Sequence, residues 1–165
     1  MKRIGWIFPG QGAQYIGMGR SFFEEYPIAK QTLAEAEDLL NRPLKKMMLE
    51  GSSEQLALTA NSQVAIYVMS IAICRTIKQL FPELVLLAAA GLSLGEYSAL
   101  SAASSISFKE GVVLVQKRAL FMQMACERHA GGMVVIIGLP TEEVVQMVRE
   151  MFLPQDLWVA NLNCP

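Results

Sequence analysis

The stretch G-L-S-L-G at residues 91–95 places Ser93 between two glycines, each two positions away. The apolar residues 84–90 before it are typical of a buried strand, and residues 96–103 after it favour a helix. A serine at a sharp strand-to-helix turn needs neighbours without a Cβ atom, because the backbone there is strained. The sequence therefore predicts a nucleophile elbow with Ser93 at its apex. The alternative is a glycine-flanked turn that contains a serine by chance.

A second glycine-rich turn follows the first predicted strand, residues 3–8. Gly10 and Gly12 flank Gln11, so the backbone N–H of Gln11 can approach a ligand closely. An acyl-transfer site uses two such donors for its oxyanion, one after the nucleophile and one from a loop after another strand. Leu94 and Gln11 are the candidates. A phosphate-binding loop is the alternative, but the glycine spacing does not match one and no Gly-Lys-Ser/Thr follows.

These motifs, together with Gly17-Met18-Gly19, Gln63 and Lys117-Arg118-Ala119, resemble the malonyl-CoA:acyl carrier protein transacylase family. The family includes the acyltransferase domains of fatty-acid and polyketide synthases. The resemblance extends over the whole chain, and the motifs are specific in combination rather than singly. It implies an α/β fold, namely an α/β-hydrolase-like core with an inserted ferredoxin-like small subdomain.

The pattern changes after residue 130. Residues 133–138 and 157–161 favour strands, and Thr141-Glu142-Glu143 caps a helix that runs to about residue 151 between them. By resemblance, residues 1–130 form the N-terminal part of the acyltransferase core, and residues 131–165 form the first half of the ferredoxin-like subdomain. We therefore expect the sequence to be the N-terminal part of a longer enzyme, with a natural mini-protein as the alternative.

Helical periodicity organises the remaining chain. Between the first strand and the elbow, this periodicity predicts five helices, at residues 19–29, 30–40, 43–49, 53–58 and 63–81. Pro27 is expected to break the last turn of the first of them. A further helix is expected over residues 109–128, closed by Gly131-Gly132.

Arg118 stands out on the helix predicted from Lys109. At about 100° per residue it falls outside the polar face that carries Lys117, and its helical neighbours include Leu114 and Phe121. A guanidinium in apolar surroundings needs a carboxylate partner. An internal Asp or Glu, a snorkelling side chain and a substrate carboxylate are the three possibilities, and the elbow favours the substrate. In the family, the matching arginine holds the free malonyl carboxylate by a bidentate contact.

The resemblance implies further substrate-binding residues. Gln63 matches a glutamine near the family's active site, although the proline that usually follows it is Val64 here. Met122, one turn after the arginine, is a candidate for the acyl pocket, although its apolar side chain favours core packing. Asn161 and Asn163 match asparagines near the site.

A serine nucleophile needs a general base. The chain has one histidine, His129, and its place at a helix end is typical of a side chain that interacts with the last carbonyls of the helix. The family's base is a histidine downstream of the small subdomain, so we expect it beyond residue 165, and the 165 residues alone to be incomplete for catalysis. Leu92 replaces the histidine that usually precedes the nucleophile, which removes a polar group under the elbow.

Composition argues against several other classes of protein. A net charge of −1 argues against nucleic acid as a partner, and no apolar run is long enough to predict a membrane span. The first residues lack the pattern of a secretory signal. Cys74, Cys126 and Cys164 have neither zinc nor redox spacing, so we expect buried free thiols in a reducing, cytoplasmic compartment. No metal or bound organic cofactor is implied.

The resemblance implies a ping-pong acyltransferase. Ser93 attacks malonyl-CoA, a malonyl-serine ester forms, and the phosphopantetheine thiol of acyl carrier protein takes the malonyl group, in fatty-acid biosynthesis. The second hypothesis is a serine hydrolase, a thioesterase or carboxylesterase, in which water takes the acyl group. Arg118 separates the two, because an esterase for neutral esters has no use for it. A non-catalytic fragment that lacks the base is the third.

Overall fold

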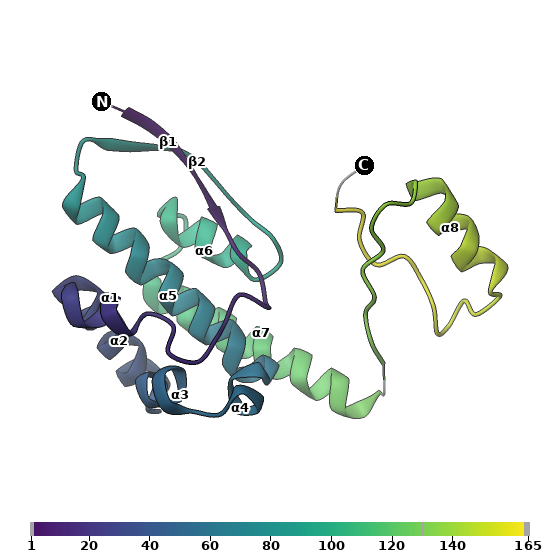
Figure 1. Cartoon of the computed structure of the whole chain (residues 1–165), viewed down its shortest axis with the longest axis horizontal. Coiled ribbons are helices and arrows are strands. Elements are labelled where there is room, and N and C mark those ends of the chain that lie inside the picture. The colour runs from purple at the N-terminus through teal and green to yellow at the C-terminus, as the bar shows by residue number, and fades with distance from the viewer. Residues whose placement is uncertain (1, 130, 164–165) are drawn as a thin grey trace. The chain divides into compact units, whose positions relative to one another are not determined.

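The computed structural model describes residues 2–129 and 131–163. They belong to two compact units, the first before residue 130 in the sequence and the second after it. In the first unit, β1 (Lys2–Phe8) and β2 (Leu84–Gly91) pair in parallel, with Phe8 opposite Gly91 (Figure 1). Parallel pairing brings the carboxyl ends of both strands to the same edge of the sheet. The turn after β1 and the turn after β2 therefore lie side by side, although they are far apart in the sequence.

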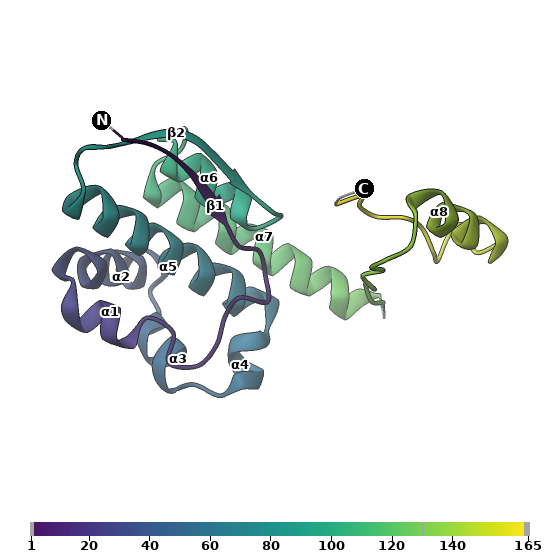
Figure 2. The ribbon, with the colours of Figure 1, turned by 45° about the horizontal axis from the view of Figure 1, so that its top comes forward.

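The helices of the first unit pack around α5, which runs through the middle of that unit. The sheet lies on one side of α5, and the first four helices lie on the other (Figure 2). The helices of this unit are α1 (Arg20–Glu25), α2 (Pro27–Leu40), α3 (Leu44–Glu50), α4 (Ser53–Ala57), α5 (Thr59–Leu80), α6 (Gly95–Ala102) and α7 (Phe108–Arg128). Each helix predicted for this region is present, but two starts were wrong. Pro27 begins α2 instead of breaking the preceding helix, because its fixed φ suits the first helical position.

The second wrong start is that of α5, which begins at Thr59 and not at Gln63. Three of the four residues before Gln63, namely Thr59, Asn61 and Ser62, are poor helix formers by propensity. Contacts with neighbouring segments override that propensity, because Asn61 hydrogen-bonds both the Gln55 carbonyl and the Arg42 guanidinium.

The core of the first unit lies between α2, α5 and α7. Tyr67 of α5 is fully buried and stacks on Phe108, with 5.8 Å between the ring centroids. Its hydroxyl lies 2.7 Å from the Ser101 hydroxyl, and burial raises the pKa of Tyr67 to about 12. Gly111 of α7 makes room for this hydroxyl, because a Cβ atom at that position would lie 1.9 Å from it.

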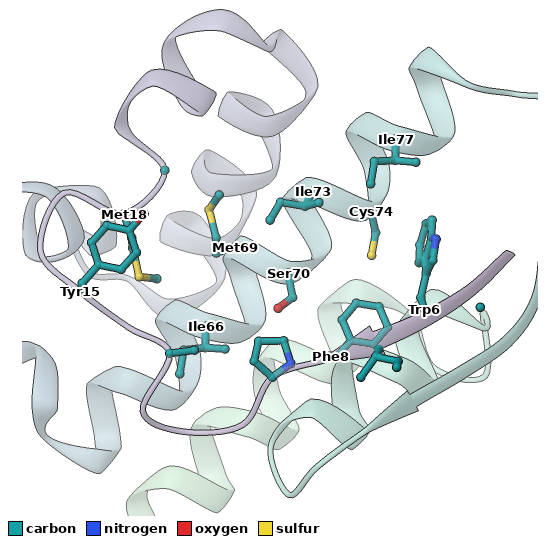
Figure 3. Close-up of a pocket in the computed structure, with 15 residues that line it drawn as sticks. Trp6, Phe8, Tyr15, Met18, Ile66, Met69, Ser70, Ile73, Cys74 and Ile77 are labelled. Carbon is teal, nitrogen blue, oxygen red and sulfur yellow. The ribbon is translucent and has the colours of Figure 1, made fainter.

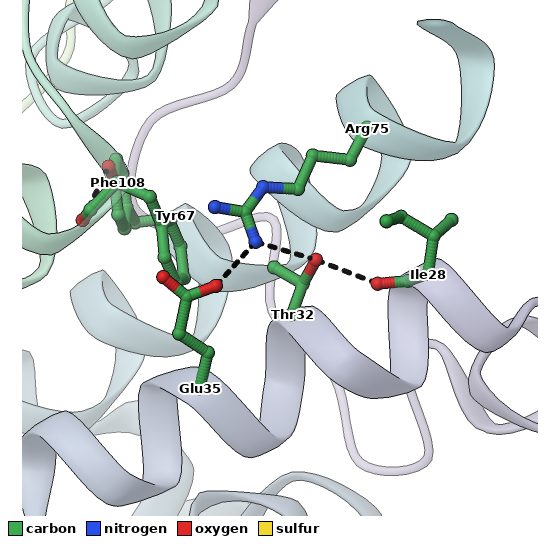
Figure 4. A network of polar contacts seen from close by, with 6 residues as sticks. All are labelled: Ile28, Thr32, Glu35, Tyr67, Arg75 and Phe108. Carbon is green, nitrogen blue, oxygen red and sulfur yellow. Dashed lines mark hydrogen bonds and ion pairs between the residues drawn. The ribbon is translucent and has the colours of Figure 1, made fainter. Parts of the chain in front are cut away.

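An ion pair joins α2 to α5 at the edge of this core (Figure 4). Arg75 donates to Glu35 at 2.7 Å and to the Thr32 hydroxyl at 3.2 Å, and its guanidinium lies 4.4 Å from the centroid of the Phe108 ring. The pair is partly exposed, so it contributes about 0–1 kcal/mol to stability. No other ion pair forms among the residues that the structure describes.

The second unit contains one helix among its described residues, α8 (Thr141–Glu150). The strands predicted at residues 133–138 and 157–161 are not formed. A strand persists only when its backbone N–H and C=O groups pair with a neighbour, and residues 131–163 supply no such ladder. The predicted cap was also wrong: Thr141 is the first helical residue, and Pro140 precedes it without a side-chain cap.

Two further predictions concern the environment of the chain. No helix in the described ranges has the length and apolar character that a membrane crossing requires. Cys74 is a buried free thiol, and burial raises its pKa to about 12. Cys126 is a free thiol but an exposed one, contrary to prediction, because it lies on the exposed last turns of α7. Cys164 lies outside the described residues.

Candidate active site

Ser93 occupies the turn between β2 and α6 with a φ of 54°, in the left-handed region that residues other than glycine rarely adopt. Both flanking glycines are required by close backbone contacts. A Cβ atom at Gly91 would lie 2.0 Å from the carbonyl carbon of Gly95, and one at Gly95 would lie 2.4 Å from the carbonyl oxygen of Phe8. The strain at Ser93 persists because the surrounding backbone leaves the turn no other path. The strand, turn and helix predicted around Ser93 are all present.

The residue after Ser93 leads directly into α6. Leu94 has helical backbone angles and a fully buried side chain, which anchors the turn in the core. The N–H groups of Gly95 and Glu96 fold back to the carbonyls of Leu92 and Ser93, at 2.9 and 3.3 Å. The Leu94 N–H makes no such bond within residues 2–129, so this donor stays available to a ligand.

The loop after β1 reaches the elbow from the neighbouring strand. A Cβ atom at Gly10 would lie 3.0 Å from the Leu92 carbonyl oxygen, so the loop passes close to the turn. The Gly12 N–H donates to the Gln14 side chain at 2.9 Å, and the Gln11 side chain donates to the Thr59 hydroxyl at 3.2 Å. The backbone N–H of Gln11 is unused in this part of the chain. Two free backbone donors, those of Gln11 and Leu94, thus lie at the edge of the sheet where Ser93 is exposed.

Arg118 of α7 is half-buried and points to the elbow. One terminal nitrogen of its guanidinium donates to Ser93 Oγ at 2.8 Å, and the other donates to the side-chain oxygen of Gln63. No carboxylate of the described residues pairs with Arg118, so the internal acid partner considered from the sequence is not found there. The site therefore holds a positive charge within hydrogen-bonding distance of the serine, without a counter-charge of its own among these residues.

Gln63 fixes the orientation of that guanidinium. It is fully buried on α5, and its amide nitrogen lies 3.3 Å from the sulfur of Met122, one turn after Arg118 on α7. Met122 itself is exposed, so it is not a core residue of the first unit. The structure therefore brings together Gln63, Arg118 and Met122, and their roles in substrate binding stay predictions.

Sequence reasoning missed Tyr97. Its ring lies beneath the Arg118 guanidinium, with 5.8 Å from the guanidinium carbon to the ring centroid, which is within the range of a cation–π contact. The sequence offered no signal for this contact, because Tyr97 lies on α6 and Arg118 on α7, and only the packing of the two helices brings them together.

Other predicted residues are placed differently. Asn161 and Asn163 are exposed in the second unit, and their role in the site stays a prediction. His129 ends α7, where its backbone N–H, not its ring, bonds the Ala125 carbonyl. Among the described residues, only Arg118 hydrogen-bonds the Ser93 side chain. The Leu92 side chain is 62% exposed, so within the first unit this position faces outward and does not lie under the elbow.

A groove of about 420 Å³ lies elsewhere in the first unit, between β1 and α5 (Figure 3). Its lining is mostly apolar, with the Ser70 hydroxyl and the Cys74 thiol on the α5 side. Trp6 and Phe8 border it along β1. The groove shares Phe8, Pro9 and Ala13 with the strand end and the loop beside the elbow. It is not lined by Ser93, Leu94, Gln11, Gln63 or Arg118, the residues of the candidate active site.

Among the described residues, one sheet edge holds a strained serine, two backbone donors without a hydrogen bond and a guanidinium without a carboxylate partner. This arrangement is suited to attack on a carbonyl and to binding of the resulting oxyanion. Comparison with known proteins agrees, because a model of the acyl transferase domain matches residues 5–153. The chain belongs to this family.

This acyltransferase-family chain is 41% identical, along its whole length, to the malonyl CoA-acyl carrier protein transacylase of Bacillus subtilis (strain 168), of which it covers 52%. It superposes on the acyl-carrier-protein S-malonyltransferase of Bartonella henselae with a TM-score of 0.82, at 34% identity, over 99% of this chain and 52% of that one. The resemblance seen in the sequence is thus confirmed, and so is the shared α/β character.

A third relative is a malonyl-transacylase solved in complex with a type II polyketide acyl carrier protein. Its TM-score to this chain is 0.79 at 34% identity, over 91% of this chain and 48% of that one. The chain spans about half the length of the curated relatives it matches.

Proposed function

We propose that Ser93 accepts a malonyl group from malonyl-CoA and passes it to the phosphopantetheine thiol of an acyl carrier protein, in fatty-acid biosynthesis. The observation that carries this proposal is Arg118, which has no carboxylate partner among the described residues and donates to Ser93 Oγ at 2.8 Å. A fixed positive charge beside the nucleophile suits an acyl group that ends in a carboxylate. The names of the relatives support the same substrate.

The reaction follows from the proposed roles of the residues at the sheet edge. Ser93 Oγ forms a bond to the thioester carbonyl carbon, and the N–H groups of Leu94 and Gln11 bind the oxyanion that develops. The carbon–sulfur bond then breaks, and CoA leaves as its thiol after the sulfur takes up the proton that Ser93 gave up. The carrier thiol next attacks the malonyl-serine ester and restores the serine hydroxyl. Resemblance assigns both proton transfers to a histidine beyond residue 165.

The proposed role of Arg118 is to bind the free malonyl carboxylate. Gln63 occupies one terminal nitrogen, and the nitrogen that contacts Ser93 Oγ can turn to the substrate. A planar guanidinium forms two parallel hydrogen bonds with a carboxylate, which an ammonium group cannot do. Met122, Asn161 and Asn163 complete the proposed substrate contacts.

The finer architecture also belongs to this proposal. Residues 1–130 are the N-terminal part of an α/β-hydrolase-like core, and residues 131–165 are the first half of a ferredoxin-like subdomain. We also propose a cytoplasmic location, which the buried, unpaired Cys74 supports because free thiols are usual in reducing compartments.

Mass spectrometry tests the proposed function. The longest form of the protein that its gene encodes is mixed with malonyl-CoA, and the modified residues are then identified. We expect a malonyl ester on Ser93, its loss in Ser93→Ala, and transfer of the group to added carrier protein. Release of malonate at the same rate with and without the carrier would instead identify a hydrolase. An adduct on another residue, or an undiminished adduct in Ser93→Ala, would contradict the proposed nucleophile.

A further inference from the structure

The opening turns of α5 contact both halves of the candidate active site. The Thr59 hydroxyl accepts a hydrogen bond from the Gln11 side chain at 3.2 Å, and Gln63, one turn later, accepts one from Arg118. We propose that Thr59 is a positioning residue for the loop that carries the Gln11 N–H, and that α5 positions this loop and Arg118 through two separable contacts. The inference rests on the function proposed above.

The start of α5 is well suited to hold other groups in place. Its first turn has no side-chain cap, and Asn61 fixes it instead. The Asn61 amide nitrogen donates to the Gln55 carbonyl at 2.8 Å, and its oxygen accepts from Arg42 at 2.9 Å. Arg42 also reaches the Ala60 carbonyl at 3.4 Å. The turn is therefore tied both to α4 and to the segment between α2 and α3.

The loop after β1, by contrast, has few contacts that fix it. Between Phe8 and Tyr15, the Gln11–Thr59 bond is the one hydrogen bond to another element that the described residues form. The Gly12 N–H bonds only the Gln14 side chain, within the loop, and Gly12 has a φ of 108° that gives the loop a glycine-only conformation. Loss of the Thr59 hydroxyl would therefore free the loop without disturbing the core.

The two contacts act on different features of the substrate. The Gln11 N–H is proposed to bind the oxyanion, which forms from every acyl thioester. Gln63 orients a guanidinium that is proposed to bind only acyl groups ending in a carboxylate. Loss of the first contact should slow acylation of Ser93 by all acyl thioesters alike. Loss of the second should slow acylation by malonyl-CoA selectively.

Acylation kinetics of the longest encoded form, with malonyl-CoA and acetyl-CoA, test the inference. Loss of a hydrogen bond of this kind is expected to lower a rate constant about 2–12-fold. We expect Thr59→Val to lower kcat by this factor for both substrates, with KM and melting temperature unchanged, and Thr59→Ser to restore it. Gln63→Leu should lower the ratio of malonyl to acetyl kcat/KM. Thr76→Val is the matched control, because the Thr76 hydroxyl bonds only the Ala72 carbonyl of α5 itself.

The outcomes separate this inference from the proposed function. If the wild type forms malonyl-serine but Thr59→Val acylates at the wild-type rate, or Thr59→Ser fails to restore it, the positioning role of Thr59 is wrong and the function stands. A change in the malonyl-to-acetyl ratio in Thr59→Val, or a loss that follows a lower melting temperature, also overturns the role. If the wild type forms no malonyl-serine, the proposed function fails and this inference fails with it.

Discussion

The two units of the chain use apolar residues in opposite ways. Residues 2–129 bury a continuous cluster between α2, α5 and α7, whereas no described residue from 131 to 163 is buried. Val134 and Ile137 in the second unit are 86% and 89% exposed. Both units nevertheless contain the helices that their sequences predict. Helices close their hydrogen bonds within one segment, but strands depend on a neighbour, so the unit without a core retains its helix and lacks its strands.

The comparison predicts its largest effect in the core. Leu33 of α2 is 2% exposed, whereas Leu162 in the second unit is 66% exposed. We expect Leu33→Ala to lower the free energy of unfolding by about 2–5 kcal/mol and Leu162→Ala by less than about 0.5 kcal/mol. Urea titration followed by circular dichroism measures both. Equal losses would show that the second unit buries Leu162 in solution, and the contrast between the units would be wrong.

Glycines should show the same contrast at the elbow. A Cβ atom at Gly91 meets backbone atoms at 2.0 Å, whereas one at Gly132 meets nothing within 4 Å. Gly91→Ala should lower the free energy of unfolding by about 3 kcal/mol and reduce labelling of Ser93 by malonyl-CoA, because the turn must open to admit the methyl group. Gly132→Ala is the matched control and should leave both unchanged. A Gly91→Ala variant with wild-type stability and labelling would refute the crowding of the turn.

Arginines test the difference in function between the units. Arg118→Ala should lower kcat/KM for malonyl-CoA by about 10–150-fold, since a charge-assisted hydrogen bond contributes about 1.5–3 kcal/mol. Acetyl-CoA lacks the carboxylate, so its use should fall less or rise. Arg149→Ala, on exposed α8, should change neither substrate. An unchanged malonyl-to-acetyl ratio in Arg118→Ala would mean that Arg118 does not bind the substrate carboxylate.

The smallest effect is expected at Tyr97. Tyr97→Leu removes the ring beneath Arg118 and should lower malonyl-CoA use by about 2–5-fold, the equivalent of about 0.5–1 kcal/mol. Tyr97→Phe keeps the ring and should retain activity. Parallel assays with acetyl-CoA give the selectivity. If Phe and Leu behave alike, the contact with the ring does not position Arg118.

Much of the site could be predicted because its signals are local. The two glycines around Ser93 and the strand and helix beside it lie within one short segment, and the position of Arg118 on its helix follows from a fixed angular period. Local signals also explain the errors. Residues 133–138 have the composition of a strand, and only a partner strand could have made them one. Cys126 has the usual preference for burial, but its part of α7 is exposed.

The sequence by itself determined the strands and helices of the first unit apart from the starts of α2 and α5, the strained turn at Ser93 and the family, because periodicity and glycine geometry depend on near neighbours. Only the tertiary structure decided which distant residues meet at Ser93. Parallel pairing of β1 with β2 carries the Gln11 loop to the elbow, and packing of α5 against α7 brings Gln63 to Arg118. The contacts of Tyr97 and Thr59 emerge the same way. These contacts depend on the chain topology, because hydrophobic burial sets which faces pack together and is not directional along the sequence.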